Sequence, residues 1–254
     1  MARVVTHSNS WKKELEALNS LGNSGNTKWS LKLYFVHILI FFGLLVLFWP
    51  LAVAYGLFVW FKSNNFNAGN SREKIIRQKE MIRRGANGEE KVFSALLALN
   101  DDWYIFNDCC IKGYQIDQIV VGPGGIFCLE VKNYSTVKID GYGNWMFWKN
   151  KKWNKMNVDP VKQNEAHVKG VTKLLRENRI GLRVSSIVVL ANRNAKLELH
   201  RNKIGETRIV VIDELVNSIY RMSTHYNITD KEVRNIVEVI FNNLQEYRVK
   251  TKVV

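Results

Sequence analysis

The sequence is poor in the residues from which several kinds of functional site are built. It has three cysteines, Cys109, Cys110 and Cys128, and none of them forms a C-x-x-C pair. An odd number with two adjacent members is a poor basis for a disulfide framework, so we expect reduced thiols in a reducing compartment, with Cys128 as a small core residue. The five histidines are scattered and none has ligand spacing to a cysteine, which argues against a zinc site.

Other absences narrow the chemistry further. The chain has no internal repeats and no low-complexity runs, and no Ser-His-Asp pattern indicates a nucleophilic hydrolase. The stretch Gly122-Pro123-Gly124-Gly125 joins two predicted strands and opens no helix, so it is not a phosphate-binding loop.

Positive charge, in contrast, is abundant. The formal net charge of +14 suits an anionic partner such as nucleic acid or lipid headgroups. Residues 1–84 hold 12 Lys and Arg against 4 acids, a net of +8, whereas residues 85–254 hold 25 against 19, a net of +6. More than half of the excess lies in the first third of the chain, so the high isoelectric point alone is weak evidence for nucleic-acid binding.

A long apolar run follows a polar segment at residues 1–30. Residues 33–61 form a stretch of 29 without a formal charge, which is long enough for one tilted transmembrane helix, and we predict a membrane segment at 31–62. Pro50 lies near its middle and permits a kink or a hairpin of two helices. A buried core helix would be shorter and amphipathic. A cleaved signal peptide, suggested by "AVA" at 52–54, conflicts with the polar leader and with the apolar sequence that follows.

The charges beside this segment predict its orientation. Its C-terminal side carries more Lys and Arg within 20 residues than its N-terminal side, so the positive-inside rule places the C-terminal domain in the cytoplasm of a membrane protein. We expect membrane lipid as one partner, because the linker at 63–84 includes a basic run, 72–84, that suits anionic headgroups. A nucleic-acid contact by the same run stays an alternative.

The rest of the chain, 85–254, predicts an α/β domain with a mixed sheet flanked by helices. A helix at 85–99 is followed by a meander of strands, then by a helix that Asp159 caps and Pro160 opens. Expected strands lie at 103–106, 114–121, 125–132, 136–139, 144–150, 184–191 and 207–212, and expected helices at about 160–178, 213–222 and 229–246.

Two of these strands carry acids where a core strand should be apolar. Side chains two apart share a face of a strand, so Glu130 and Lys132 share a face, and the short turn between the strands can bring Asp117 near Glu130. Glu89 lies one turn before Phe93 and points toward the buried face of its helix. A divalent metal would relieve the repulsion of the carboxylates, and Lys132 could orient a water or stabilise a phosphate. An ion pair of Glu130 and Lys132 is the simpler alternative.

Three stretches carry a family resemblance: "GANGEEKV" (85–92), "YQIDQIVVGPGGIFCLEVKNY" (114–134) and "DPVKQ" (159–163). In this order and spacing they resemble the nuclease-related domain (NERD), a branch of the PD-(D/E)xK restriction-endonuclease-like superfamily. The resemblance implies a restriction-endonuclease-like fold with a metal-dependent phosphodiesterase core. In that reading Asp117 and Glu130 bind Mg²⁺, helped by the carbonyl of Val131.

The resemblance also assigns the remaining catalytic candidates. Lys132 would position the attacking water or the scissile phosphate, Glu89 would support metal or water, and Gln163 would complete the wall of the site. The family often has His where Gln118 stands and Asn where Asp159 stands, and neither change removes a proposed ligand. We therefore expect a membrane-anchored, Mg²⁺-dependent nuclease acting on nucleic acid, DNA ahead of RNA, without an organic cofactor. The alternative is a non-catalytic, membrane-tethered nucleic-acid-binding or interaction module.

Two weaker candidates complete the set. His167 follows Gln163 by four residues and so shares its helix face, although such a histidine is often a packing or polar-surface residue. Residues 145–157 interleave aromatic residues with lysines, which suits phosphate contact plus base stacking. An amphipathic hairpin with its lysines in solvent is the alternative. The candidate nucleic-acid-binding residues are Lys149, Lys151, Lys152 and Lys155.

Overall fold

The computed structural model describes most of the chain outside the apolar segment. The described residues are 1–7, 10–24, 68–140, 144–192, 196–198, 203–223 and 227–245, with isolated positions at 36, 38, 40, 53, 55 and 57. The chain divides into two compact units. The first contains Met1–Trp11 and Arg83–Lys250, and the second contains Lys12–Ile82 and Thr251–Val254.

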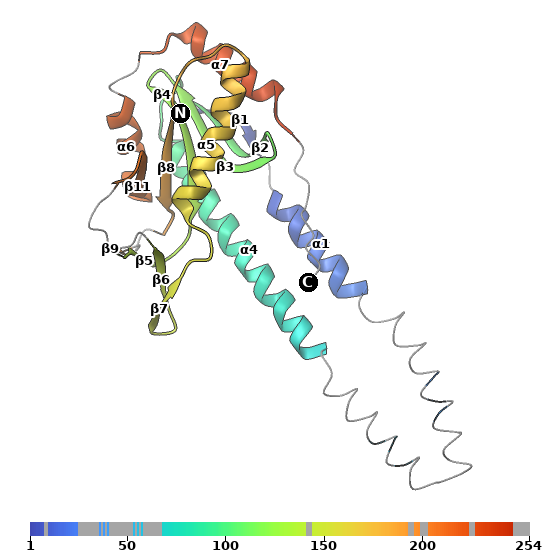
Figure 1. Cartoon of the computed structure of the whole chain (residues 1–254). Helices are drawn as coiled ribbons and strands as arrows, with labels where there is room; N and C mark the ends of the chain where they lie inside the picture. The colour runs from blue at the N-terminus through green and yellow to red at the C-terminus, as the bar shows by residue number, and fades with distance from the viewer. Residues whose placement is uncertain are drawn as a thin grey trace. The chain divides into compact units, whose positions relative to one another are not determined.

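The first unit is built on a seven-stranded mixed sheet (Figure 1). Its strands follow the order β1-β2-β3-β4-β8-β11-β10. In that order the bounds are Arg3–His7, Tyr104–Ile111, Tyr114–Gly122, Gly125–Lys132, Val184–Leu190, Thr207–Val211 and Lys203–Ile204. β2, β3 and β4 form an antiparallel meander, and β8 and β11 then add in parallel. The sheet is therefore an α/β sheet of mixed direction, as the sequence predicts.

Helices cover both faces of this sheet because the two sets of strand side chains are both apolar. The C-terminal part of α4 (Ala68–Leu96) and α6 (Leu215–Met222) pack on one set, which includes Phe127 and Leu129. α5 (Pro160–Glu177) and α7 (Asp230–Asn242) pack on the other, which includes Ile126 and Cys128. Asp159 caps α5, accepting bonds from the N–H groups of Val161 and Lys162, with Pro160 at its first turn as expected.

Three strands of a second, four-stranded sheet lie between β4 and α5 in the chain, and its fourth strand, β9, follows β8 (Figure 1). Its order is β7-β6-β5-β9, with bounds Lys152–Lys155, Trp145–Lys149, Thr136–Ile139 and Lys196–Glu198. Val137 and Trp145 from this sheet share an apolar cluster with Val161 of α5 and with Val188 and Leu190 of β8. The small sheet is thereby packed against the end of the main sheet where β4 and β8 finish.

Three features add to the predicted elements. The sequence predicts no strand before Gly85, yet β1 pairs in parallel with β2 and forms one edge of the main sheet. The helix expected at 85–99 begins earlier, because α4 starts at Ala68 and ends at Leu96. The strand expected at 144–150 is part of a hairpin, in which β6 turns back into β7.

The predicted membrane segment at 31–62 lies outside the described residues except for the six isolated positions. Among the residues that are described, no helix combines the length and the apolar character needed to cross a bilayer. Of the isolated positions, Val36, Ile38, Ile40, Val53 and Leu57 are exposed apolar side chains. In the second unit the described elements are most of α1 (Ser10–Ser24) and the first half of α4.

Candidate active site

The predicted pairing of the two acid-bearing strands is confirmed. β3 and β4 form an antiparallel ladder from Gly122↔Gly125 to Gln118↔Leu129, so Asp117 comes directly after the last pair. There its side chain accepts a hydrogen bond of 2.6 Å from the backbone N–H of Val131. The carboxylate thus takes the place of a backbone acceptor at the point where the two strands part.

Glu130 and Lys132 lie at the end of β4 and share the face of the sheet that α5 covers. The side chain of Glu130 is almost fully buried, at 1% exposed, and its Oε1 lies 2.5 Å from the Nζ of Lys132. The same Nζ lies 3.2 Å from Oε1 of Gln163, which α5 presents from its first turns. The ion pair that the sequence offers as an alternative is therefore present, and Gln163 contacts it.

His167, one turn further along α5, meets the other oxygen of Glu130. Its Nδ1 lies 3.3 Å from Oε2, and in the described part of the chain neither atom has a hydrogen-bond partner. The imidazole ring also makes an edge contact with Tyr114, with ring centroids 6.2 Å apart. Burial, followed by the charge of Lys132, lowers the pKa of His167 to about 4, so the ring is neutral near pH 7.

Glu89 reaches the site from the opposite layer because α4 approaches the end of β4 closely. A Cβ on Gly88 would lie 2.8 Å from the Cβ of Asn133, so this approach requires glycine. The side chain of Asn133 donates a hydrogen bond of 2.8 Å to the carbonyl of Arg84 on the same helix. Glu89 is half-buried while Glu90 faces solvent, which agrees with the helix face predicted from the spacing to Phe93.

The pKa values of these residues reflect several buried acids that lie close together. Burial and then the neighbouring carboxylate of Asp117 raise the pKa of Glu89 and of Glu130 to about 8 each. Burial raises the pKa of Asp117 to about 6 despite the opposing effects of Lys132 and the Val131 N–H. Burial lowers the pKa of Lys132, but the carboxylates of Glu130 and Asp117 outweigh it and raise the pKa above its ordinary value.

Asp108 is a fourth acid, which the sequence analysis missed. The β2–β3 ladder passes from Asn107↔Gln118 to Cys109↔Ile116 without a shift of register, so Asp108 lies opposite Asp117, with a φ of 50°. It accepts hydrogen bonds from the backbone N–H of Ser10 and from the side chain of Gln115. Its charge contributes to the raised pKa of Glu89 and of Asp117. Counting register back from the turn at Lys112 and Gly113 would have found this position.

The donor set has the chemistry of a divalent-cation site. Asp117 and Glu130 supply buried carboxylates whose mutual repulsion a cation would relieve, and Glu130 Oε2 has no hydrogen-bond partner within the described residues. Val131, whose carbonyl is the expected third ligand, follows Glu130 and contacts Asp117 through its N–H. Within the same described part, no group of three or more His, Cys, Asp or Glu side chains is placed to hold a metal ion. The site would thus depend on two carboxylates and a backbone oxygen.

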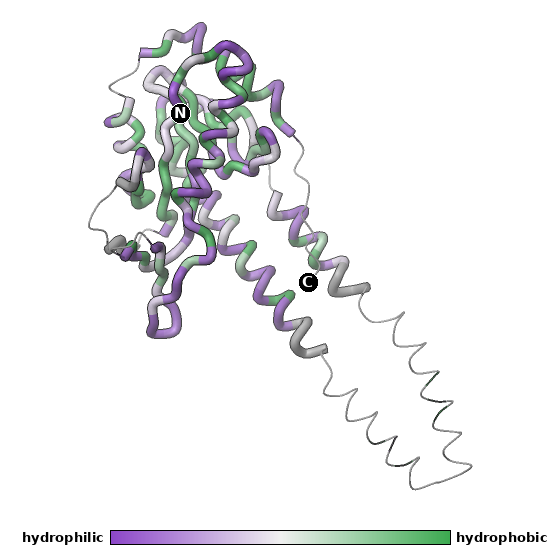
Figure 2. Tube along the Cα trace, in the orientation of Figure 1, coloured by the Kyte–Doolittle hydropathy of each residue, from purple (hydrophilic) through white to green (hydrophobic). Residues whose placement is uncertain are grey.

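The four candidate nucleic-acid-binding lysines lie on the β6–β7 hairpin and are all exposed. Figure 2 shows the hydrophilic character of this hairpin, in contrast to the apolar strands of the main sheet. Lys149 and Lys152 are cross-strand partners, and the turn between them contains Lys151 with a φ of 59°. Lys155 pairs with Met146 at the base of the hairpin.

Aromatic residues stiffen this hairpin. Trp148 and Trp153 are cross-strand partners in edge contact, with ring centroids 5.3 Å apart. The Nζ of Lys138 lies 4.3 Å from the centre of the Trp153 ring, whereas Trp148 remains 45% exposed. The hairpin therefore offers an exposed aromatic face beside its lysines.

Comparison with known proteins agrees with the resemblance. Residues 84–191 match the family model of NERD, the nuclease-related domain, and this range contains every predicted site residue. Neither the curated proteins nor the solved structures give a match to the chain. A nuclease-related domain is therefore present from the end of the basic run to the end of β8, and the mixed α/β sheet is consistent with the restriction-endonuclease-like superfamily.

Proposed function

We propose that the nuclease-related domain at residues 84–191 hydrolyses phosphodiester bonds of nucleic acid with the help of Mg²⁺ or another divalent cation. The observation that carries this proposal is the convergence of Asp117, Glu130 and Lys132 at one end of the sheet. Structural ion pairs do not need a second buried acid beside them, and here that acid raises the pKa of Glu130. A cation between the two carboxylates would remove this cost.

The residues present would divide the work as follows. Asp117 and Glu130, with the carbonyl of Val131, would hold the cation, which supplies positive charge to the phosphate and lowers the pKa of a bound water. Lys132 lies at the rim beside Glu130, where its ammonium group can donate to a phosphate oxygen or orient the water. Gln163 accepts a hydrogen bond from that ammonium group and so limits its positions.

Glu89 would act from the α4 side of the site. With a pKa of about 8, its carboxyl group holds a proton near pH 7 in the metal-free protein. Charge from a cation nearby would favour loss of that proton, which leaves a carboxylate able to accept a hydrogen bond from water. The role of Glu89 is therefore to support water or metal rather than to bind the phosphate.

The hairpin lysines would contact the phosphates of the substrate, DNA ahead of RNA. Lys149 and Lys152 oppose each other directly, an arrangement of like charges that costs stability in a sheet. An anionic backbone would relieve that repulsion, and the exposed Trp148 offers a stacking surface for a base.

A membrane location with the domain in the cytoplasm forms part of the same proposal. The uncharged segment 33–61 supports it, as do the exposed apolar side chains at positions such as Val36 and Leu57. The basic linker that follows suits anionic lipid headgroups on the cytoplasmic side.

Cleavage assays on the full chain test the proposal. Purified protein would be incubated with single- and double-stranded DNA and RNA, with and without Mg²⁺, beside the Asp117→Ala and Lys132→Ala variants. We expect Mg²⁺-dependent cleavage that falls about 100-fold or more in either variant. Lys162→Ala is the matched control, because Lys162 is an exposed lysine next to Gln163 on α5. Cleavage that is equal in the wild type and both site variants would sink the proposed site.

A non-catalytic nucleic-acid-binding module is the second candidate function. The observation in its favour is that Nζ of Lys132 already lies 2.5 Å from Oε1 of Glu130, a contact that a purely structural role would explain. This function predicts Mg²⁺-independent binding without cleavage, and binding that survives Asp117→Ala.

A further inference from the structure

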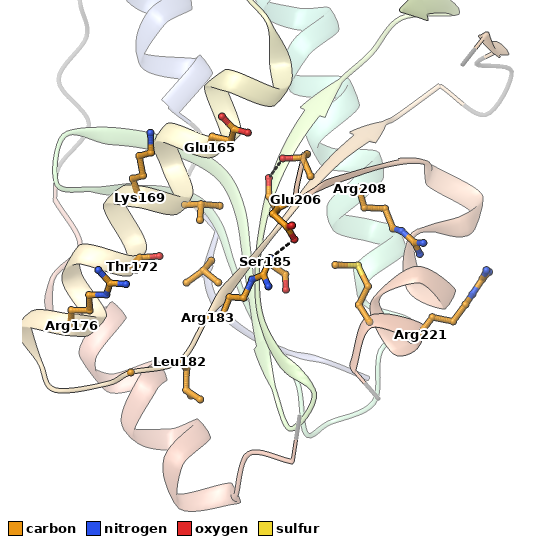
Figure 3. Close-up of a pocket in the computed structure, with 16 residues that line it drawn as sticks. Glu165, Lys169, Thr172, Arg176, Leu182, Arg183, Ser185, Glu206, Arg208 and Arg221 are labelled. Atoms are coloured by element: carbon orange, nitrogen blue, oxygen red, sulfur yellow. Dashed lines mark hydrogen bonds and ion pairs between the residues drawn. The ribbon is translucent and has the colours of Figure 1, made fainter. Parts of the chain in front are cut away.

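We infer that a basic groove at the far end of α5 binds the phosphodiester backbone of the same nucleic acid whose scissile bond occupies the candidate site. This inference rests on the proposed function. The groove has a volume of about 810 Å³. Its walls come from α5, from the start of β8, from the start of β11 and from the end of α6 (Figure 3).

Cationic side chains from all four walls line the groove. Four of the five are arginines, and the set is Lys169, Arg176, Arg183, Arg208 and Arg221. The acids are Glu165 and Glu206, and Glu206 is already paired with Arg183 (Figure 3). Cations on a protein surface are usually only solvated, but here they converge from separate elements on one concave surface. The balance of charge selects an anionic ligand.

The groove lies at the opposite end of the sheet from the candidate site. Glu130 of β4 pairs with Val188 of β8, whereas the groove includes Val184, which pairs with Ile126 at the start of β4. α5 connects the two places, since it presents Gln163 at the site and Arg176 at the groove. Thirteen residues of helix between them correspond to about 20 Å.

The spread of the cations favours a polymer over a small anion. Lys169 and Arg176 are two turns apart on α5, about 10 Å, so the two side chains can contact separate phosphates of one strand. Guanidinium groups bind phosphate oxygens through two parallel hydrogen bonds, which suits a run of phosphodiesters. At about 3.4 Å per nucleotide, the distance from the site corresponds to about six nucleotides. Lys169 is nearer, six residues or about 9 Å from Gln163, which corresponds to about three nucleotides, so a dinucleotide held in the site stops short of the groove.

Oligonucleotide length provides the test. Binding of single-stranded DNA of about 2 and about 20 nucleotides to the full chain would be measured by fluorescence anisotropy in EDTA at several salt concentrations. The variants are Lys169→Glu and Arg176→Glu. The matched control is Lys173→Glu, an exposed lysine of α5 outside the groove lining. We expect both groove variants to weaken binding of the long oligonucleotide several-fold and to lower its salt slope by about one, with the short one and the control unaffected.

Several outcomes would overturn the inference. The groove is not a nucleic-acid site if the groove variants match the control, if they weaken short and long oligonucleotides equally, or if wild type binds neither length. It is also overturned if the variants lose binding to anionic phospholipid vesicles and keep binding to the long oligonucleotide. Cleavage in Mg²⁺ is read separately. If wild type cleaves but the groove variants show no length-dependent loss of binding, the groove alone is rejected. If the groove variants show that loss but wild type does not cleave, the proposed nuclease activity alone is rejected.

Discussion

Single residues of the candidate site hold protons at pH values where surface carboxyl groups have lost them. Glu89 and Glu130 reach a pKa of about 8 because they are buried beside Asp117. Lys132 offsets part of this effect but is shared between carboxylates. Buried carboxyl groups this close together destabilise the fold unless a positive charge lies beside them. For this reason we propose that a cation binds there.

Stability of the metal-free protein should therefore fall from about pH 7 to about pH 8. In this interval the folded state keeps protons on Glu89 and Glu130 that the unfolded state, with an ordinary value of 4.5, has released. Raising the pH then favours unfolding, by at most about 1.4 kcal/mol per pH unit for each extra proton that the folded state binds. His167 is neutral in the folded state and mostly neutral in the unfolded state, so its opposing contribution is small. Melting of the full chain in EDTA measures the effect, and Mg²⁺ should reduce it.

Replacement of single glutamates identifies which carboxyl group causes the pH dependence of stability. Glu89→Gln should flatten the pH dependence, whereas Glu90→Gln, at the exposed neighbouring position, should leave it unchanged. A melting temperature that stays constant or rises from pH 7 to pH 8 in EDTA contradicts the proposed carboxylate crowding.

Among the secondary-structure elements, α4 is the one whose position the site depends on. A Cβ on Gly88 would meet Asn133 at 2.8 Å, so Gly88→Ala must shift the helix away from β4 and with it Glu89. Gly85 on the same helix has nothing within 4 Å of its Cβ position. Gly85→Ala should therefore stabilise the protein by about 0.5–1 kcal/mol, while Gly88→Ala lowers stability and cleavage. Urea unfolding and cleavage assays compare the two, and equal stabilisation by both would refute the close approach.

In the β6–β7 hairpin, one substitution should raise the stability of the fold and at the same time weaken nucleic-acid binding. Lys149→Glu places an acid opposite Lys152, which should stabilise the hairpin by about 0.2–1 kcal/mol. The same change removes a proposed phosphate contact, so oligonucleotide binding should weaken and its salt slope should fall by about one. Lys91→Glu, on the exposed face of α4, serves as the control. Unchanged binding would mean that the hairpin lysines are a solvated surface.

These elements can be predicted from the sequence where the residues that determine them are close together in the chain. Alternation along β3 and β4 predicts the faces of Asp117, Glu130 and Lys132, since a period of two leaves no choice once one face is apolar. The spacing of Glu89 and Phe93 likewise predicts the orientation of Glu89. Asp108 has a positive φ within β2, and the pattern of β2 alone, in which Ile105 to Cys109 are all buried, does not predict its place in the site.

Long-range pairing limits prediction most. β1 is five residues long and pairs with β2, whose residues lie 101 positions away, so nothing in its own sequence indicates a partner. The groove at the end of α5 is hard to predict from the sequence for the same reason. Its cations come from four elements, and only the order of β8 and β11 in the sheet brings them together.

At the scale of the whole molecule, the first unit contains residues that precede the apolar segment in the sequence and residues that follow it. Met1–Trp11 and Arg83–Lys250 belong to it together. A segment that enters a membrane between them must return to the side from which it came. The proposed membrane location therefore requires both ends of the apolar segment to lie on the same side of the membrane.

Reporters fused to either end of the chain test this topology. Fusions before Met1 and after Val254 should both be active only in the cytoplasm, because β1 and the rest of the sheet share one compartment. A reporter before Met1 that is active outside while the one after Val254 is active inside would contradict this topology.

The pairing of β1 with β2 also dictates an order of events during synthesis. β1 leaves the ribosome first, but its partner follows about a hundred residues later, which at about 5–20 residues per second is a delay of about 5–20 s. The whole apolar segment is made within that interval, before the edge of the sheet can close. The main sheet therefore cannot gain its edge strand until the apolar segment and β2 have both been synthesised.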